Sequence, residues 1–120
     1  AYYLDANTTG TSLNVAGAIV AAGNVTAYSD IKFKENIKVI PDAVEKVKAM
    51  RGVTYTRNDL EDREVRHTGV IAQEVEQVLP EAVREGINGK TVAYGNMVGL
   101  LIEAIKEQQK QIDELKAKLL

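Results

Sequence analysis

A heptad pattern of apolar residues begins at Val98 and continues almost to the C-terminal end of the chain. Six of its seven core positions are apolar, and the exception is Gln108. The a and d positions are Val98, Leu101, Ile105, Gln108, Ile112, Leu115 and Leu119. This pattern predicts a coiled-coil helix over residues 95–120, with a single amphipathic helix packed on its own domain as the alternative. Gln108 is typical of a core residue that sets register, and Ile102 at an e position widens the apolar face; the heptads leave the number of strands open.

The pattern over residues 41–56 predicts a short helix followed by a strand. Pro41 suits the first position of a helix whose apolar face is formed by Val44, Val47 and Met50. Gly52 is placed where such a helix would stop. Residues 53–56 (VTYT) then combine β-branched and aromatic side chains in alternation, as a strand does. The highly polar residues 58–64 are expected to form an exposed loop.

Residues 70–94 predict a second helix and a hairpin. Apolar residues at helical spacing over 70–79 indicate a short amphipathic helix, which Pro80 ends. The dipeptide Asn88–Gly89 separates residues 82–85 from residues 91–94, and this arrangement is typical of a two-residue hairpin turn of type I′. The middle of the chain is therefore predicted to be a small mixed α/β domain.

Residues 1–28 consist mainly of Ala, Val, Thr, Asn and Gly in short β-prone runs. These runs predict brief strands with tight turns. Such a strip has too little bulky apolar surface to fold alone, so it needs copies of itself or a body upstream. We expect the end of a trimeric β-fibre, with a disordered linker as the alternative. The fold class predicted for the whole chain is α+β: a β-rich fibre stub, a small mixed domain and a long C-terminal helix that forms a trimeric coiled coil.

Charge is distributed unevenly along the 120 residues. The chain has 15 basic and 17 acidic side chains, and Asp5 is the one charged residue among the first 28. The sharpest change in composition therefore falls at Ser29. The net charge of −2 argues against nucleic acid or an anionic membrane as the main partner. No apolar run approaches ~18 residues and no signal-peptide pattern is present, so no membrane span is predicted.

The residue types also narrow the possible chemistry. With no cysteine, thiol nucleophiles and thiolate metal sites are excluded, and a lone His67 makes a histidine metal site unexpected. No cofactor and no metal are predicted. Because Ala1 is not a start methionine, we expect the chain to be a piece of a longer protein.

Ser29 at the charge boundary is a possible nucleophile. A serine hydroxyl needs a base, and a neutral lysine amine can serve. Lys34 lies five residues further along and Lys32 three. On a strand, residues 29 and 34 would face opposite sides, so a Ser29–Lys34 pair requires the chain to turn between them. By spacing alone this pair is weak evidence for a catalytic site.

Three sequence blocks in a fixed order strengthen the case for a catalytic Ser29–Lys34 pair. Residues 29–37 (SDIKFKENI), 68–75 (TGVIAQEV) and 79–83 (LPEAV) resemble the C-terminal intramolecular chaperone domain of phage tailspikes, tail fibres and endosialidases. Myelin regulatory factors carry a related domain. The resemblance covers residues 29–120, so it divides the chain into a fibre end over residues 1–28 and a chaperone domain over residues 29–120. Lys32 and Phe33 stand where family members often have Arg and Leu, and both changes keep the character of the side chain.

The resemblance implies that the domain trimerises, helps the upstream fibre to fold and then cuts itself off at its own first residue. The family's nucleophile maps to Ser29 and its lysine base to Lys34, so the bond to be cut is Tyr28–Ser29. Ser29 would attack the Tyr28 carbonyl by an N-to-O acyl shift, and water would hydrolyse the ester. His67, or a backbone N–H near Gly69, could bind the oxyanion, although His67 could equally be an exposed polar residue.

The partners expected are therefore the chain itself as a homotrimer and the upstream fibre. The expected locations are the virion tail fibre or spike before cleavage, and the bacterial host cytoplasm for the released domain. Three alternatives remain open at this point: a trimerisation cap that does not cleave, a fragment of a membrane-anchored transcription factor, and a generic coiled-coil adaptor.

Overall fold

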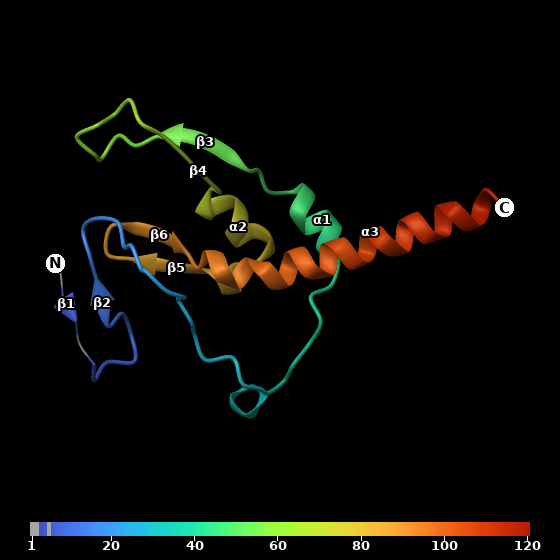
Figure 1. Ribbon diagram of the computed structural model, residues 1–120, viewed down its shortest axis with the longest axis horizontal. Coiled ribbons are helices and arrows are strands. Elements are labelled where there is room, and N and C mark those ends of the chain that lie inside the picture. Colours follow the sequence, from blue (N-terminus) through green and yellow to red (C-terminus); the bar gives the residue numbers. More distant parts are fainter. Residues whose placement is uncertain (1–2, 5) are drawn as a thin grey trace. The chain divides into compact units, whose positions relative to one another are not determined.

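The structure is a computed structural model that describes residues 3, 4 and 6–120. The chain forms two compact units, Ala1–Ile37 and Lys38–Leu120 (Figure 1). Residues 1, 2 and 5 of the predicted fibre end lie outside the described residues. None of the helices in the described part of the chain combines the length and apolar character that a membrane crossing needs.

The first unit contains little regular structure. Strands β1 (Tyr3–Leu4) and β2 (Leu13–Asn14) pair antiparallel, with Leu4 opposite Leu13. Residues 15–28 form no strand, although their composition predicted short ones. A strand needs a hydrogen-bonded partner, and this small-residue segment has none among the described residues. The unit ends with a one-turn 3₁₀ helix, η1 (Ile31–Phe33).

The second unit is a small mixed α/β domain with a long C-terminal helix, as the sequence predicted. Its elements in chain order are α1 (Ala43–Lys48), β3 (Val53–Thr56), β4 (Arg66–Gly69), α2 (Ala72–Val78), η2 (Pro80–Ala82), β5 (Val83–Gly86), β6 (Gly89–Val92), η3 (Tyr94–Met97) and α3 (Val98–Lys118). Strand β3 pairs antiparallel with β4, and β5 pairs antiparallel with β6. The strand at 53–56 and the polar loop at 58–64 are confirmed, but the partner strand β4 was not predicted. Its short Arg-His-Thr-Gly sequence has no apolar alternation to reveal it.

The hairpin is present, but the expected turn is wrong by one residue. Ile87 and Asn88 form the turn, and Gly89 begins β6 opposite Gly86. A type I′ turn needs positive φ at both central residues, yet in this hairpin only Gly89 has it, with φ of 121°. A β-branched Ile87 strongly disfavours positive φ, so the glycine takes the unusual conformation instead.

The core of the second unit lies where α1, α2 and the hairpin meet the first turns of α3. Leu100 and Val75 are fully buried. The buried apolar residues are Ala43, Val75, Leu79, Ala82, Val83, Met97, Leu100 and Ala104. On α3, the residues that pack inward therefore occupy the c and g positions of the heptads.

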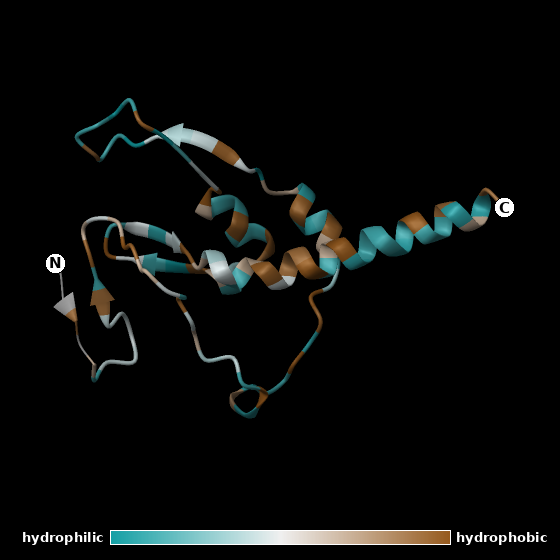
Figure 2. Ribbon diagram, viewed as in Figure 1, coloured by the Kyte–Doolittle hydropathy of each residue, from teal (hydrophilic) through white to brown (hydrophobic). Residues whose placement is uncertain are grey.

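The predicted coiled-coil seam is a different face of the same helix. Ile105 is 66% exposed and Leu115 is 60% exposed, and residues 108–120 are exposed throughout. Figure 2 shows apolar positions recurring along α3 well past the part that packs on α1. Helix α3 thus packs on its own domain with one face and leaves an apolar heptad seam uncovered.

The start of α1 is held by a side chain from α3. The helix begins at Ala43, two residues later than the sequence predicted, and Asp42 precedes it in the left-handed region (φ 52°) without a side-chain cap. Instead, the Glu107 carboxylate accepts hydrogen bonds from the backbone N–H groups of Ala43 (2.8 Å) and Val44 (3.0 Å). A carboxylate at this position satisfies two otherwise unpaired donors and interacts favourably with the helix dipole.

The two backbone hydrogen bonds lower the pKa of Glu107 below its ordinary value of 4.5. A lowered pKa in the folded state means that the carboxylate stabilises the fold fully above pH ~4.5 and progressively less as the pH falls through the folded-state pKa. We therefore expect Glu107→Gln to lower the Tm at pH 7, with the difference from wild type shrinking in acid. Thermal unfolding between pH 3 and 7 measures this, and Glu114→Gln on the exposed part of α3 is the matched control. A Glu107→Gln deficit that does not depend on pH would contradict the capping role.

Candidate functional site

The short turn η1 brings Ser29 and Lys34 together. The backbone N–H of Lys34 donates to the Ile31 carbonyl at 3.0 Å, and the Asp30 carboxylate accepts from the N–H of Lys32 at 2.9 Å. The chain therefore turns between residues 29 and 34, as a serine–lysine pair requires. As a result, Lys34 Nζ donates a hydrogen bond of 2.7 Å to Ser29 Oγ. Asp30 is the N-cap residue of this turn.

Lys32, the other lysine near Ser29, is directed elsewhere. Its ammonium lies 5.1 Å from the centroid of the Phe33 ring, a cation–π distance. The same ring lies 6.2 Å from that of Tyr28, so Phe33 contacts the residue whose carbonyl precedes Ser29. Sequence reasoning gave Phe33 no role, because a neighbour contact between residues 28 and 33 depends on the turn. Lys34, not Lys32, is the lysine in hydrogen-bond contact with Ser29.

The Ser29–Lys34 pair is exposed to solvent in the single chain. Tyr28 is 96% exposed, and the apolar side chains of Ile31, Phe33 and Ile37 are also largely exposed. An exposed lysine and serine make a hydrogen bond, but water competes for both groups. A catalytic pair would need a drier environment, and the first unit of one chain does not supply it.

His67 and Gly69 lie in the second unit, on β4. The His67 ring stacks on Tyr55 of β3 with centroids 5.9 Å apart, and its Nε2 atom is buried without a hydrogen-bond partner among the described residues. His67 is half-buried, which is more than the exposed alternative predicted. The position of the His67 ring depends on the pairing of β3 with β4, which brings Tyr55 beside it. The sequence predicted neither this strand pair nor the ring contact.

Gly69 is required by the close approach of a tyrosine. The Tyr94 hydroxyl accepts a hydrogen bond from the N–H of Val70 at 3.3 Å. A Cβ on residue 69 would lie 2.5 Å from that hydroxyl oxygen, closer than atoms in contact can come. Because Gly69 has no side chain, the Tyr94 hydroxyl can approach and form this hydrogen bond, which links the end of β4 to the start of η3.

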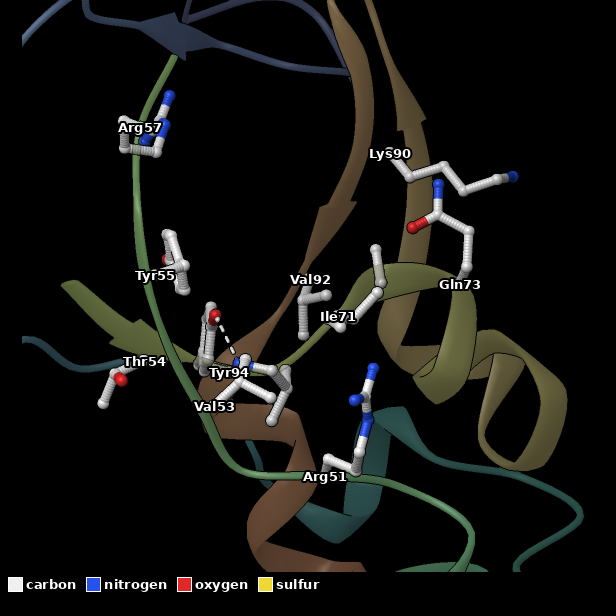
Figure 3. A pocket seen from close by; sticks show the side chains of 12 residues that line it. Arg51, Val53, Thr54, Tyr55, Arg57, Ile71, Gln73, Lys90, Val92 and Tyr94 are labelled. Carbon is white, nitrogen blue, oxygen red and sulfur yellow. Dashed lines mark hydrogen bonds between the residues drawn. The ribbon is translucent and has the colours of Figure 1, made fainter. Parts of the chain in front are cut away.

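An open pocket of about 650 Å³ lies beside this tyrosine, between β3, the start of α2 and β6 (Figure 3). Three cationic side chains line it, and each is paired with a carboxylate. Arg51 pairs with Glu74 at 2.6 Å, Arg57 pairs with Asp59, and Lys90 pairs with Glu76 at 3.0 Å and Glu85 at 2.9 Å. The hydrogen bond from Arg51 lowers the pKa of Glu74. All three cations in the pocket wall are therefore already paired with carboxylates.

Comparison with known proteins identifies the class. Residues 29–84 match the family Peptidase_S74, described as the chaperone of endosialidase, and the match begins at Ser29. Residues 29–84 belong to this family, which is the family that the three sequence blocks predicted.

Its relatives include phage fibre proteins. The chain is 38% identical over 108 residues to the long tail fiber protein Gp37 of Enterobacteria phage K3, covering 84% of this chain and 9% of that protein. The Gp37 protein of Enterobacteria phage M1 is 38% identical over 116 residues, covering 86% of this chain and 46% of that protein. Myelin regulatory factor homolog 1 of Caenorhabditis elegans is 30% identical over 116 residues, covering 89% of this chain and 12% of that protein. The chain thus spans less than half the length of these relatives.

Proposed function

We propose that the chain is the end of a trimeric phage tail fibre or tailspike followed by an intramolecular chaperone that releases itself by cutting the Tyr28–Ser29 bond. Residues 1–28 belong to the fibre and residues 29–120 to the chaperone, with residues 95–120 as its coiled-coil helix. The observation that carries the proposal is the 2.7 Å hydrogen bond between Lys34 Nζ and Ser29 Oγ, beside the bond to be cut. The family match beginning at Ser29 and the similarity to Gp37 proteins support it.

The cut proceeds through an ester. Ser29 Oγ attacks the Tyr28 carbonyl carbon through a five-membered ring, and the neutral Lys34 amine takes the hydroxyl proton. The bond between the Tyr28 carbon and the Ser29 nitrogen then breaks, and the Lys34 ammonium returns a proton to the leaving amine. Water hydrolyses the resulting ester to a Tyr28 carboxylate and restores the Ser29 hydroxyl. Attack within one chain has a large proximity advantage, up to ~7–11 kcal/mol in ideal geometries.

Assembly provides what the single chain lacks. Three copies around one axis would cover the exposed apolar residues beside Ser29 and exclude water from the Ser29–Lys34 pair. The oxyanion donor in the assembled protein would be a backbone N–H near Gly69 or the His67 ring. Each chain cuts once, so the protein is a single-turnover serine autoprotease.

Two uncovered surfaces support the proposed homotrimer. Each of five seam residues is between 46% and 66% exposed: Val98, Leu101, Ile105, Ile112 and Leu115. Residues 15–28 pair with no strand in the described part of the chain. Parallel association of three α3 helices would cover the seam and align the three copies of residues 15–28. The partners proposed are the chain itself and its upstream fibre, without nucleic acid or membrane. The fibre would belong to the virion, and the released domain would remain in the host cytoplasm.

A cap that trimerises without cutting is the second candidate, and the exposure of the Ser29–Lys34 pair in the single chain favours it. A denaturing gel of freshly expressed protein separates the two functions. Self-cleavage gives fragments of 28 and 92 residues, whereas the cap stays at 120 residues. An assembled trimer that keeps one band of 120 residues through long incubation would make the non-cleaving cap the better function.

A further inference from the structure

A second, smaller groove lies between α1 and α3. Its volume is about 240 Å³, and its lining residues are Val44, Val47, Lys48, Leu101, Ala104, Ile105 and Gln108. Val44 and Val47 are half-buried and pack against the core from α1. The α3 wall includes Leu101 and Ile105, which are 46% and 66% exposed. An apolar groove with such exposed walls is an incomplete packing arrangement within one chain.

The four α3 residues of this groove have a telling spacing. Leu101, Ala104, Ile105 and Gln108 follow the pattern i, i+3, i+4, i+7, so they surround one point on the helix surface. Four residues arranged in this way form the hole that receives one side chain of a facing helix in a coiled coil. In the heptads these four positions are d, g, a and d. When two helices are parallel and in register, a hole of this kind receives the side chain at the a position of the facing helix.

We propose that this groove receives α3 of a second copy of the chain, with the partner subunit's Ile105 seated in the hole and α1 as an additional wall. This inference rests on the proposed homotrimer and adds that α1 is part of the assembly surface. Two observations on α3 select a second copy as the occupant. The hole is continuous with the exposed seam that runs on through Ile112 and Leu115, and its register matches that seam.

Ile102 supports the same arrangement. It occupies an e position and is 50% exposed, where two-stranded or three-stranded coiled coils usually place a polar residue. In parallel helices an e position faces the g side of the neighbour. Ala104 is the g residue of the hole, and α1 packs on that side of α3 through Leu100 and Ala104. An apolar Ile102 would therefore meet the apolar wall that Val44 and Val47 provide.

Consequently the assembly surface differs along α3. Over residues 98–108 each helix would contact both α3 and α1 of its neighbour, and beyond residue 108, where α1 no longer lines the helix, the contact would be a simple coiled coil. The small Ala104 at the g position fits this layout, because a larger side chain there would fill the space between α1 and the incoming helix.

The chain has no cysteine, so introduced cysteines report this contact directly. Lys48→Cys and Ile102→Cys are made in separate full-length chains, which are coexpressed, purified and mildly oxidised. A disulfide between the two kinds of chain forms only where α1 of one copy lies beside α3 of another. We expect a strong band of two linked chains on a non-reducing gel, which reductant removes.

The matched control pairs Lys46→Cys with Ile102→Cys. Lys46 is two residues from Lys48, on the opposite side of α1, and should give only background linkage. Each cysteine variant is also oxidised alone, because two identical chains could link through the same position and give a band of the same size. If sedimentation shows a trimer but the Lys48 and Ile102 pair links no better than the control, the inference is wrong and the homotrimer stands. If the wild-type chain is a monomer, the proposed function itself fails.

Discussion

Ser29→Ala is expected to abolish cleavage of the Tyr28–Ser29 bond while leaving the trimer intact. The substitution removes the hydroxyl that can reach the Tyr28 carbonyl through a small ring, and Ser29 is exposed and outside the core. Lys34→Ala keeps that hydroxyl but removes the amine 2.7 Å from it, so we expect the rate to fall by roughly 10²–10⁴-fold. Mass spectrometry of the products over time measures both.

Lys32→Ala is the matched control for the base. Lys32 is also a lysine within five residues of Ser29, but its ammonium lies over the Phe33 ring. Cleavage in this variant should therefore persist near the wild-type rate. If Lys34→Ala cut at the wild-type rate while Lys32→Ala did not, the base would have been assigned to the wrong residue.

Polar substitutions in the exposed seam are expected to convert the trimer to a monomer. Ile112→Gln with Leu115→Gln removes two apolar side chains that are 46% and 60% exposed in the single chain, so the folded monomer loses little. In a coiled coil both residues would face the axis, where uncompensated polar groups are costly. In the uncleaved Ser29→Ala background, sedimentation equilibrium should give three times 13.1 kDa without the two seam substitutions and 13.1 kDa with them.

The control carries two glutamine substitutions off the seam, at Lys110 and Glu114, and should remain trimeric. Removing residues 96–120 altogether should leave an upstream fibre aggregated, because the coiled coil forms through local contacts and would align three slow-folding strips. That deletion also removes Leu100 from the core, so it unfolds the second unit as well. The seam variant is therefore the cleaner experiment. Soluble, native, trimeric fibre from a longer chain that carries the seam substitutions would exclude the chaperone role.

Local sequence patterns were enough to predict much of the secondary structure. The β-branched alternation at 53–56, the apolar spacing before Pro80 and the heptads after Val98 each depend on residues close together in the chain. The same is true of the Ser29–Lys34 pair, because five residues and one 3₁₀ turn are sufficient to bring the two side chains into contact. Its assignment as a catalytic pair came from the family resemblance.

Features that depend on distant residues could not be predicted in this way. The start of α1 was predicted at Pro41, but Glu107, more than sixty positions along the chain, caps the helix at Ala43. Strand β4 forms because β3 offers it a partner, although its own sequence has no strand-like alternation. In both cases a hydrogen bond between separate elements outweighs local propensity.

Helix α3 shows most clearly which features the local sequence determines and which the tertiary structure determines. The heptads determined that the helix has an apolar seam, since the spacing of Val98, Leu101 and Ile105 follows from the sequence alone. Only the tertiary structure decided which face packs on the domain: Leu100 and Ala104 enter the core, and the seam stays open. The physical reason is that a helix wide enough in its apolar surface can bury either of two adjacent faces, and the shape of α1 and its neighbours, which the local pattern does not contain, selects one of them.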